Sequence, residues 1–253
     1  MTKEFLKVKQ LLKLLNNMKV TAIVPVWNEN SEKLNLVLSK LQNFVDELVV
    51  IDDGSEINVK CPVCQSADAS RQITGRQMLN IKCQILRHQI NRGQGAALQT
   101  GTDYAVQHGA DIIVHFDADG QHQAEDIPDL IKPLQQGQVD FVFGSRFLGK
   151  TSNLPWSKKH FILPIAKLIN YLFTGLKLTD THNGIRAFKS SVADKLYLTQ
   201  DKMAHASEYP YLVKKNKIKF TEVPVKIIYH EYGQGIGGGV RIIKELLAGK
   251  MVK

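Results

Sequence analysis

The sequence contains no long hydrophobic run and no leader-like start. Its 253 residues include no stretch of about 18 or more consecutive apolar residues, the length that a membrane-spanning helix needs. The pattern of a secretory signal, a basic start followed by an apolar core and a small-residue cleavage site, is also missing. We therefore expect a cytoplasmic protein.

Cysteine is scarce as well. The chain has three cysteines, an odd number that argues against a disulfide framework. Cys61 and Cys64 have the spacing of half a zinc site, and Cys83 with His88 would complete four ligands. Because a second Cys-x-x-Cys pair is missing, we expect free thiols rather than a structural zinc at Cys61, Cys64 and Cys83.

Charge is unbalanced toward the positive. Lysine and arginine number 33, against 24 aspartate and glutamate residues, so the formal net charge is +9. Such a chain favours anionic partners, including nucleotide diphosphates, lipid headgroups and nucleic acid. We expect no nucleic-acid partner, because the interleaved aromatic and basic residues of a recognised nucleic-acid-binding module are missing.

Short apolar runs alternate with helical patterns from residue 20 onward. The runs at residues 20–26, 47–51, 81–86, 112–116 and 139–143 are typical of buried strands. Helical spacing occurs between them at residues 34–41, 95–107 and 124–135, and residues 56–80 are predicted to form a loop. This alternation predicts an α/β fold with a doubly wound, mostly parallel sheet, helices on both faces and ligands at the carboxyl ends of the strands.

The fourth apolar run ends in the sequence Asp117-Ala118-Asp119-Gly120-Gln121-His122. Alternate residues of a strand share a face, so the carboxylates of Asp117 and Asp119 can converge on one cation. Carboxylate oxygens are ligands that magnesium and manganese prefer. An ordinary turn is the alternative, because aspartate and glycine are common turn residues.

A glycine-rich segment, residues 91–98, lies between a predicted strand and a predicted helix. Backbone amides at such a helix start can attract phosphate. The segment lacks the Gly-Lys-Ser/Thr ending of a P-loop and the three-glycine spacing of dinucleotide-binding folds, which argues against both functions. The alternative is structural, because glycine lets a helix approach the sheet closely.

Two segments are amphipathic. Residues 1–19 combine an apolar stripe with several lysines, a pattern that fits an interfacial helix on an anionic membrane or a terminal helix docked on its own domain. Residues 158–173 are rich in apolar side chains but too short to span a bilayer. They fit either an amphipathic helix that guides a lipid acceptor or a core or dimer helix.

Five polar motifs follow one another along the chain. They are Pro25-Val26-Trp27-Asn28-Glu29, Ile51-Asp52-Asp53-Gly54-Ser55, Asn91-Arg92-Gly93-Gln94-Gly95-Ala96-Ala97, Asp117-Ala118-Asp119-Gly120-Gln121 and Gly144-Ser145-Arg146. Their order resembles that of family 2 glycosyltransferases, most closely the branch similar to dolichyl-phosphate mannose synthase, which residues 179–188 also fit. The resemblance implies one GT-A domain over residues 20–253, with a nucleotide-sugar half at about 20–145 and an acceptor half at about 146–253.

The resemblance also implies a nucleotide-diphosphate sugar donor, a cofactor that is Mg2+ or Mn2+, and roles for individual residues. Around the base and ribose it places Pro25, Trp27, Glu29, Ile51 and Asp53. Along the diphosphate it places Asp117, Ala118 and Asp119. The implied metal site is formed by Asp117, Asp119 and Gln121. Arg146 would neutralise the diphosphate or an acceptor phosphate, a task that suits its planar fork of donors.

The acceptor decides whether a general base is needed. A polyprenyl phosphate, which the resemblance suggests, is already anionic and needs none, whereas a hydroxyl acceptor requires one. Asp180 and Glu208 are the candidate bases and, with Arg146, the candidate catalytic residues. The branch carries an arginine and a lysine late in the chain where this sequence has His230 and Ile236, so Arg241 or Lys226 would supply the missing charge.

We therefore predict a metal-dependent, inverting hexosyltransferase that acts on a polyprenyl phosphate or a cell-envelope glycan precursor. We expect contact with the cytoplasmic membrane face, or with a small membrane protein partner, to bring the chain to a lipid acceptor. One alternative is a sugar-phosphate nucleotidyltransferase, which would open with a glycine-rich triphosphate loop that residues 25–29 lack. The other is a catalytically silent nucleotide-sugar-binding or membrane scaffold module, against which Asp117 and Asp119 argue.

Overall fold

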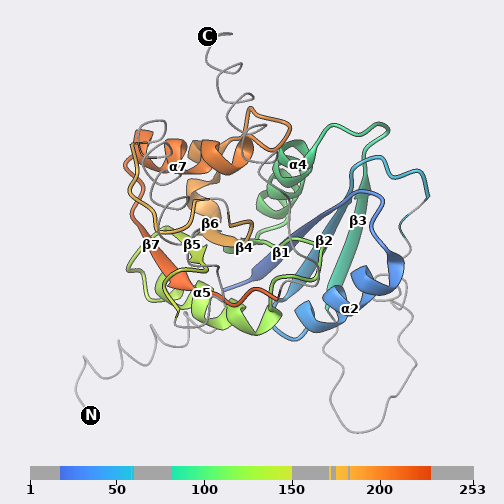
Figure 1. Cartoon of the computed structure of the whole chain (residues 1–253), viewed down its shortest axis with the longest axis horizontal. Helices are drawn as coiled ribbons and strands as arrows, with labels where there is room; N and C mark the ends of the chain where they lie inside the picture. Colours follow the sequence, from blue (N-terminus) through green and yellow to red (C-terminus); the bar gives the residue numbers. More distant parts are fainter. Residues whose placement is uncertain are drawn as a thin grey trace, which may run out of the picture.

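The computed structural model describes residues 18–57, 59, 81–149, 171, 175–181 and 183–228. The described strands form one seven-stranded sheet with the order β3-β2-β1-β4-β6-β5-β7 (Figure 1). Their bounds are β1 Val20–Val26, β2 Glu47–Asp52, β3 Lys82–Arg87, β4 Ile112–His115, β5 Phe141–Ser145, β6 Arg186–Lys189 and β7 Phe220–Pro224. The predicted α/β fold is confirmed.

Helices cover both faces of the sheet. The described helices are α2 Ser31–Leu41, α4 Gln94–Gln107, η1 Ala124–Asp126, α5 Ile127–Gln135, η3 Ser190–Leu196 and α7 His205–Lys215. The apolar sides of α2 and α5 pack in one hydrophobic cluster with one face of β1. Those of α4, η3 and α7 pack in a second cluster on the opposite face.

Strand direction brings several strand ends to one edge. β1 pairs in parallel with β2 and β4, and β5 pairs in parallel with β7. β6 runs antiparallel to both of its neighbours, and its first residue, Arg186, pairs with His115 of β4 and with Phe143 of β5. The start of β6 therefore lies beside the carboxyl ends of β4 and β5. A strand from the predicted acceptor half is thus built into the centre of the sheet.

The sequence did not predict β6 or β7. β6 is only four residues long and is bounded by Arg186 and Lys189, so it has no apolar run. It is a strand because the sheet buries Arg186, Ala187 and Phe188 between β4 and β5. β7 lies at the edge of the sheet and is mostly only partly buried, which weakens its apolar pattern.

Cys83 lies on β3 and is disulfide-bonded, so the expectation of a free thiol there is wrong. A disulfide sulfur is not the thiolate that zinc binds. Cys61 and Cys64 lie outside the described residues, as do residues 1–17, residues 158–170, His230, Ile236 and Arg241. Over the part of the chain that the structure describes, no helix is long and apolar enough to cross a membrane.

Gly101 on α4 tests the close packing of this helix on the sheet. A Cβ added there would overlap the Cγ2 of Ile23 on β1. We expect Gly101→Ala to lower the free energy of unfolding by about 1–3 kcal/mol through overpacking, as measured by urea denaturation. The exposed Gln107→Ala on the same helix should change it by less than about 0.5 kcal/mol. Equal stability of the two variants would contradict the packing described.

Candidate active site

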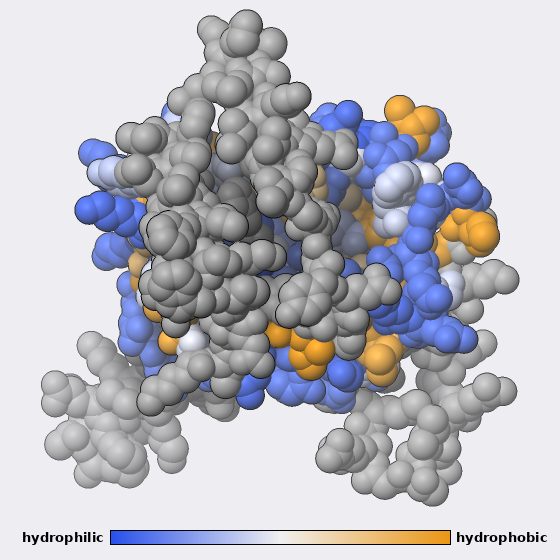
Figure 2. Space-filling model, in the orientation of Figure 1, coloured by the Kyte–Doolittle hydropathy of each residue, from blue (hydrophilic) through white to orange (hydrophobic). Residues whose placement is uncertain are grey.

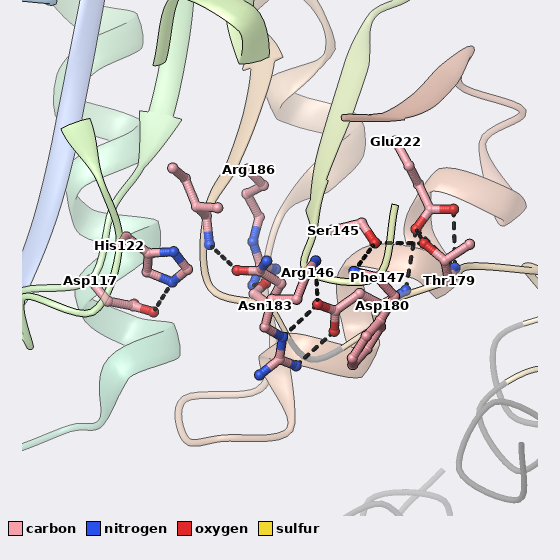
Figure 3. Close-up of polar contacts among 11 residues, drawn as sticks. Asp117, His122, Ser145, Arg146, Phe147, Thr179, Asp180, Asn183, Arg186 and Glu222 are labelled. Carbon is pink, nitrogen blue, oxygen red and sulfur yellow. Dashed lines mark hydrogen bonds and ion pairs between the residues drawn. The ribbon is translucent and has the colours of Figure 1, made fainter. Parts of the chain in front are cut away.

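Asp117 follows β4 at the shared strand edge, and three other parts of the chain hold its carboxylate. Gln94 Nε2 at the start of α4 donates a hydrogen bond to Oδ1 at 2.8 Å. His122 Nε2 lies 3.4 Å from Oδ2. The backbone of Gly184 is packed against the same oxygen so closely that an added Cβ would overlap it. The direction of the carboxylate is therefore fixed by the protein, and Figure 3 shows its contact with His122.

The charge of Asp117 is also stabilised. Burial alone would raise the pKa of this carboxyl. The hydrogen bond from His122 and the positive charges of His122 and Arg186 outweigh that effect, so the pKa of Asp117 lies below its ordinary value. Asp117 thus remains ionised at neutral pH without help from a cation.

Arg186 holds the backbone that is packed against Asp117. Its side chain is buried, and the guanidinium lies over the ring of Tyr209 with its carbon 4.6 Å from the ring centroid. Nε donates to the carbonyl of Gly184 and a terminal nitrogen donates to that of Asn183, both at 3.1 Å. In Figure 3, Arg186 and Asn183 lie between Asp117 and the Arg146–Asp180 pair. Arg186 therefore fixes the backbone that is packed against Asp117.

Asp119 begins a turn as well as offering a carboxylate. Its Oδ1 accepts a hydrogen bond from the backbone nitrogen of Gln121 at 2.9 Å, and Gly120 has a φ of 73°. The turn is further held by residues after β7, where the nitrogen of Ile228 donates to the carbonyl of Gln121. Asp119 therefore does form a turn, as the alternative interpretation expected. This hydrogen bond uses only one of its two carboxylate oxygens.

These residues fit a hard divalent cation. Asp117 and Asp119 supply carboxylate oxygens, and Gln121 lies in the same loop. Within the described ranges, no group of three or more histidine, cysteine, aspartate or glutamate side chains is placed to hold a metal. A cation here would therefore take its remaining ligands from Gln121, water or substrate phosphates, as Mg2+ commonly does.

Three backbone amides of the glycine-rich segment are already in use. Asp53 accepts hydrogen bonds from the backbone nitrogens of Arg92 and Gly93, and the nitrogen of Ala96 donates to the carbonyl of Asp201. These amides are not free to bind phosphate. The structural role of the glycines is observed instead, because a Cβ at Gly93 would overlap the carbonyl oxygen of Asp201. The segment serves the site by placing Gln94 against Asp117.

The residues expected around a base and ribose divide into exposed and buried sets. Trp27 is 58% exposed at the end of β1, and Glu29 beside it lies 3.7 Å from Lys33. Pro25, Ile51 and Asp53 are buried. The side chain of Ile51 packs under α4 and does not line an open surface. Trp27 and Glu29 are therefore the members of this set that can meet a ligand directly, and the buried ones support them.

Arg146 and Asp180 form a bidentate ion pair. Nε and a terminal nitrogen of Arg146 donate to the two carboxylate oxygens at 2.6 and 2.7 Å, and the backbone nitrogen of Arg146 donates at 3.0 Å. Glu222 on β7 holds the loop of Asp180, since it accepts hydrogen bonds from the backbone nitrogens of Thr179 and Asp180. Asp180 is buried, whereas Arg146 is one-quarter exposed. The carboxylate therefore orients the guanidinium.

Glu208, the other candidate base, is bound to a neighbouring loop. Its oxygens accept hydrogen bonds from the backbone nitrogen and hydroxyl of Thr199 and from the nitrogen of Gln200. Gln200 and Asp201 in turn pack against the glycine segment that carries Gln94. Glu208 therefore holds the loop of Thr199 and Gln200, which lies against that segment.

Sequence reasoning missed four residues of the site. Gln94, Gly184 and Glu222 each act on another site residue through a contact between distant parts of the chain. Arg186 acts on the carbonyl of Gly184, two residues before it. Gln94, Gly184 and Arg186 stand inside segments that the motif pattern already singled out, which is the signal that could have found them.

Comparison with known proteins gives consistent results. The model of a family described as Glycosyl transferase family 2 matches residues 21–197. The chain is 34% identical over 241 residues to a UDP-N-acetylglucosamine–dolichyl-phosphate N-acetylglucosaminyltransferase from Methanococcus voltae, a match that covers 91% of this chain and 96% of the relative. It is 29% identical to an undecaprenyl-phosphate mannosyltransferase from Micrococcus luteus, with 88% and 89% of the two chains covered.

Solved structures show the same fold. Glucosyl-3-phosphoglycerate synthase from Mycobacterium tuberculosis, crystallised with Mn2+, uridine diphosphate and glucosyl-3-phosphoglycerate, matches with a TM-score of 0.64. The match covers 95% of this chain and 81% of that one at 15% identity. The same enzyme has also been crystallised with Mg2+ and uridine diphosphate.

Gly184→Ala tests the support of Asp117. The added methyl group should displace the Asp117 carboxylate, so we expect Mn2+-dependent binding of UDP or GDP to weaken by at least about tenfold, as measured by calorimetry. Gly137→Ala is the matched control. Gly137 has a φ of 70° and no atom within 4 Å of an added Cβ, so this variant should lose stability while binding remains intact. Unchanged binding in Gly184→Ala would contradict the contact.

Buried His205 should make the free energy of unfolding depend on pH. Burial and then the nearby charge of Arg186 lower its pKa to about 4 from 6.5. Between these values the unfolded chain binds more protons than the folded one, so this contribution to stability is lost as the pH falls. The expected loss is about 3 kcal/mol between pH 7 and pH 4. His205→Asn should flatten the dependence of unfolding free energy on pH, and His108→Asn, at an exposed site, should not. Identical slopes in all three proteins would contradict this assignment.

Proposed function

The chain belongs to glycosyl transferase family 2, and from this we propose that it transfers a hexose from a nucleotide-diphosphate sugar to a polyprenyl phosphate. The names of the relatives support this choice, because they describe transferases that act on dolichyl phosphate and undecaprenyl phosphate. A cell-envelope glycan precursor, the other acceptor class that the sequence left open, would offer a hydroxyl group instead of a phosphate.

The proposed acceptor is supported above all by the contacts of the two candidate bases. Asp180 is bound to Arg146, and Glu208 is bound to Thr199 and Gln200. A hydroxyl acceptor would need a base free to remove its proton. A phosphate acceptor is already an anion and needs no proton removed. The commitment of both carboxylates to other contacts therefore favours a phosphate nucleophile.

On the donor side, Asp117 and Asp119, with Gln121, would hold Mg2+ or Mn2+. When bound, the cation would stabilise the negative charge that builds on the leaving nucleoside diphosphate. Trp27 offers an exposed ring on which a base can stack. Gln94, His122 and Gly184 fix the direction of Asp117 before any ligand arrives, so little reorganisation is needed on binding. The crystallised neighbours with Mn2+ or Mg2+ support this cofactor.

On the acceptor side, Arg146 is the proposed phosphate contact. Asp180 occupies two nitrogens of its guanidinium and leaves the group one-quarter exposed. A held guanidinium loses less freedom on binding an anion than a mobile one. Lys226 is exposed beside the loop of Gln121 and offers a further positive charge. We propose that the protein meets its lipid acceptor at the cytoplasmic face of a membrane, as a peripheral protein.

The direct test is transfer itself. Purified protein with Mn2+, labelled UDP- and GDP-sugars and a polyprenyl phosphate should produce a butanol-extractable, lipid-linked sugar. Asp119→Asn should lower the rate by more than the roughly 10- to 100-fold that loss of an outer partner of a metal costs. Asp129→Asn, the same charge change at an exposed position on α5, should match the unaltered protein. Transfer to a sugar hydroxyl but to no lipid phosphate would refute the proposed acceptor.

A further inference from the structure

We propose that the outer side of α7, together with neighbouring residues, docks this protein on an anionic lipid bilayer. The surface consists of Tyr171, Lys177, Lys195, Tyr211, Lys214 and Lys215, and is called the tyrosine–lysine face below. The inference rests on the proposed function in one respect, which is that a polyprenyl phosphate acceptor is held in a membrane.

Three segments distant in sequence meet to form this face. Tyr211, Lys214 and Lys215 are exposed and have the i, i+3, i+4 spacing that places residues on one side of a helix. A Cβ at Gly175 would lie 3.6 Å from the Cγ of Lys214, so Gly175 lies beside α7. Its backbone nitrogen donates to the carbonyl of Tyr171 at 2.7 Å. At the end of the same helix, Asn216 Nδ2 donates to the carbonyl of Lys195 at 2.7 Å. Both neighbouring segments therefore adjoin α7.

Each tyrosine of the face is paired with a lysine. The ammonium of Lys177 lies 5.5 Å from the ring centroid of Tyr171, and that of Lys215 lies 5.6 Å from that of Tyr211. The two tyrosine residues are nonetheless 40% and 42% exposed. Amphipathic rings beside ammonium groups are the side chains that favour the boundary between lipid and water.

The face carries positive charge that the described protein does not neutralise. No ion pair between described residues involves Lys177, Lys195, Lys214 or Lys215. Asp194 is an exposed acid on η3 close to Lys195 in sequence, whereas Glu208 on α7 is bound to Thr199. Figure 2 shows hydrophilic residues along the edge of the molecule beside α7 and β7. Clustered lysines attract anionic headgroups, each contributing about fivefold to binding near the surface.

The position of the face relative to the site favours a lipid bilayer over another polyanion. Lys177 stands three residues before Asp180, a distance of at most about 10 Å along the chain. Asp180 holds Arg146, the proposed phosphate contact. Docking the face on a bilayer would therefore place the short segment from Lys177 to Asp180, which leads to Arg146, on the membrane side of the protein.

The test compares two triple variants of the full chain that lose the same charge. Lys195→Gln/Lys214→Gln/Lys215→Gln removes lysines from the face, and Lys33→Gln/Lys40→Gln/Lys132→Gln removes them from α2 and α5 on the opposite side of the sheet. Binding is measured by sedimentation with vesicles of phosphatidylglycerol and phosphatidylcholine. We expect the face variant to bind at least tenfold more weakly than the unaltered protein and the control variant to bind within about twofold of it. Residues 1–17 are the same in all three proteins, so their contribution cancels.

Equal binding of the two variants would overturn the proposal, because net charge alone would then explain it. Loss of binding to a single-stranded oligonucleotide by the face variant, with vesicle binding unchanged, would overturn it as well. Transfer assays separate the two proposals. With acceptor in detergent micelles the face variant should keep the unaltered kcat/KM, and with acceptor in vesicles it should lose activity. A loss in micelles would contradict a docking role, whereas absence of transfer by the unaltered protein in micelles would contradict the proposed function alone.

Discussion

The fixed carboxylate of Asp117 is the interaction on which the site depends. A buried strand, β4, ends two residues before it, and three further segments of the chain meet at its oxygens. A carboxylate on a strand end would otherwise rotate into solvent, where its charge is well hydrated. Here the backbone of Gly184 limits its movement, Gln94 and His122 direct it, and the charge of Arg186 stabilises its ionised form. The rest of the fold can be understood as the support for these contacts.

Two buried charged groups show how this support is built. Arg186 is covered by Tyr209 and is satisfied by carbonyl groups, while Asp180 is satisfied by Arg146 and by backbone nitrogen. Buried charges are costly unless they are paired or hydrogen-bonded. Both groups lie in or next to the segment from Thr179 to Arg186, which connects the donor and acceptor sides of the site. Changing this segment would therefore affect both sides together.

The sequence predicted the parts of the fold that depend on local pattern. The apolar runs ending near Pro25, Ile51 and Phe116 are strands because each is buried on both faces, and burial of that kind leaves a continuous apolar run. The order of the polar motifs predicted which edge of the sheet carries the site, and the structure places Asp117 and Asp119 together in one loop there. Arg186 is the first residue of β6, a central strand that has no apolar run. Its burial depends on Tyr209 and on carbonyl groups that the fold brings together, so a local pattern could not predict this strand. The hydrogen-bond partners of Asp180 and Glu208 could not be predicted either, because a sequence shows where a carboxylate stands but not which groups bind it in the fold.

The central claim is that Asp117 and Asp119 hold a divalent cation against the diphosphate of the donor. Anomalous X-ray diffraction at the manganese edge, from crystals grown with Mn2+ and a nucleoside diphosphate, tests it most directly. The account predicts one strong anomalous peak within bonding distance of an oxygen of Asp119, next to Asp117 and in contact with the diphosphate. A nucleotide bound at the end of β1 with the manganese peak elsewhere in the molecule, or with no peak at all, would contradict it.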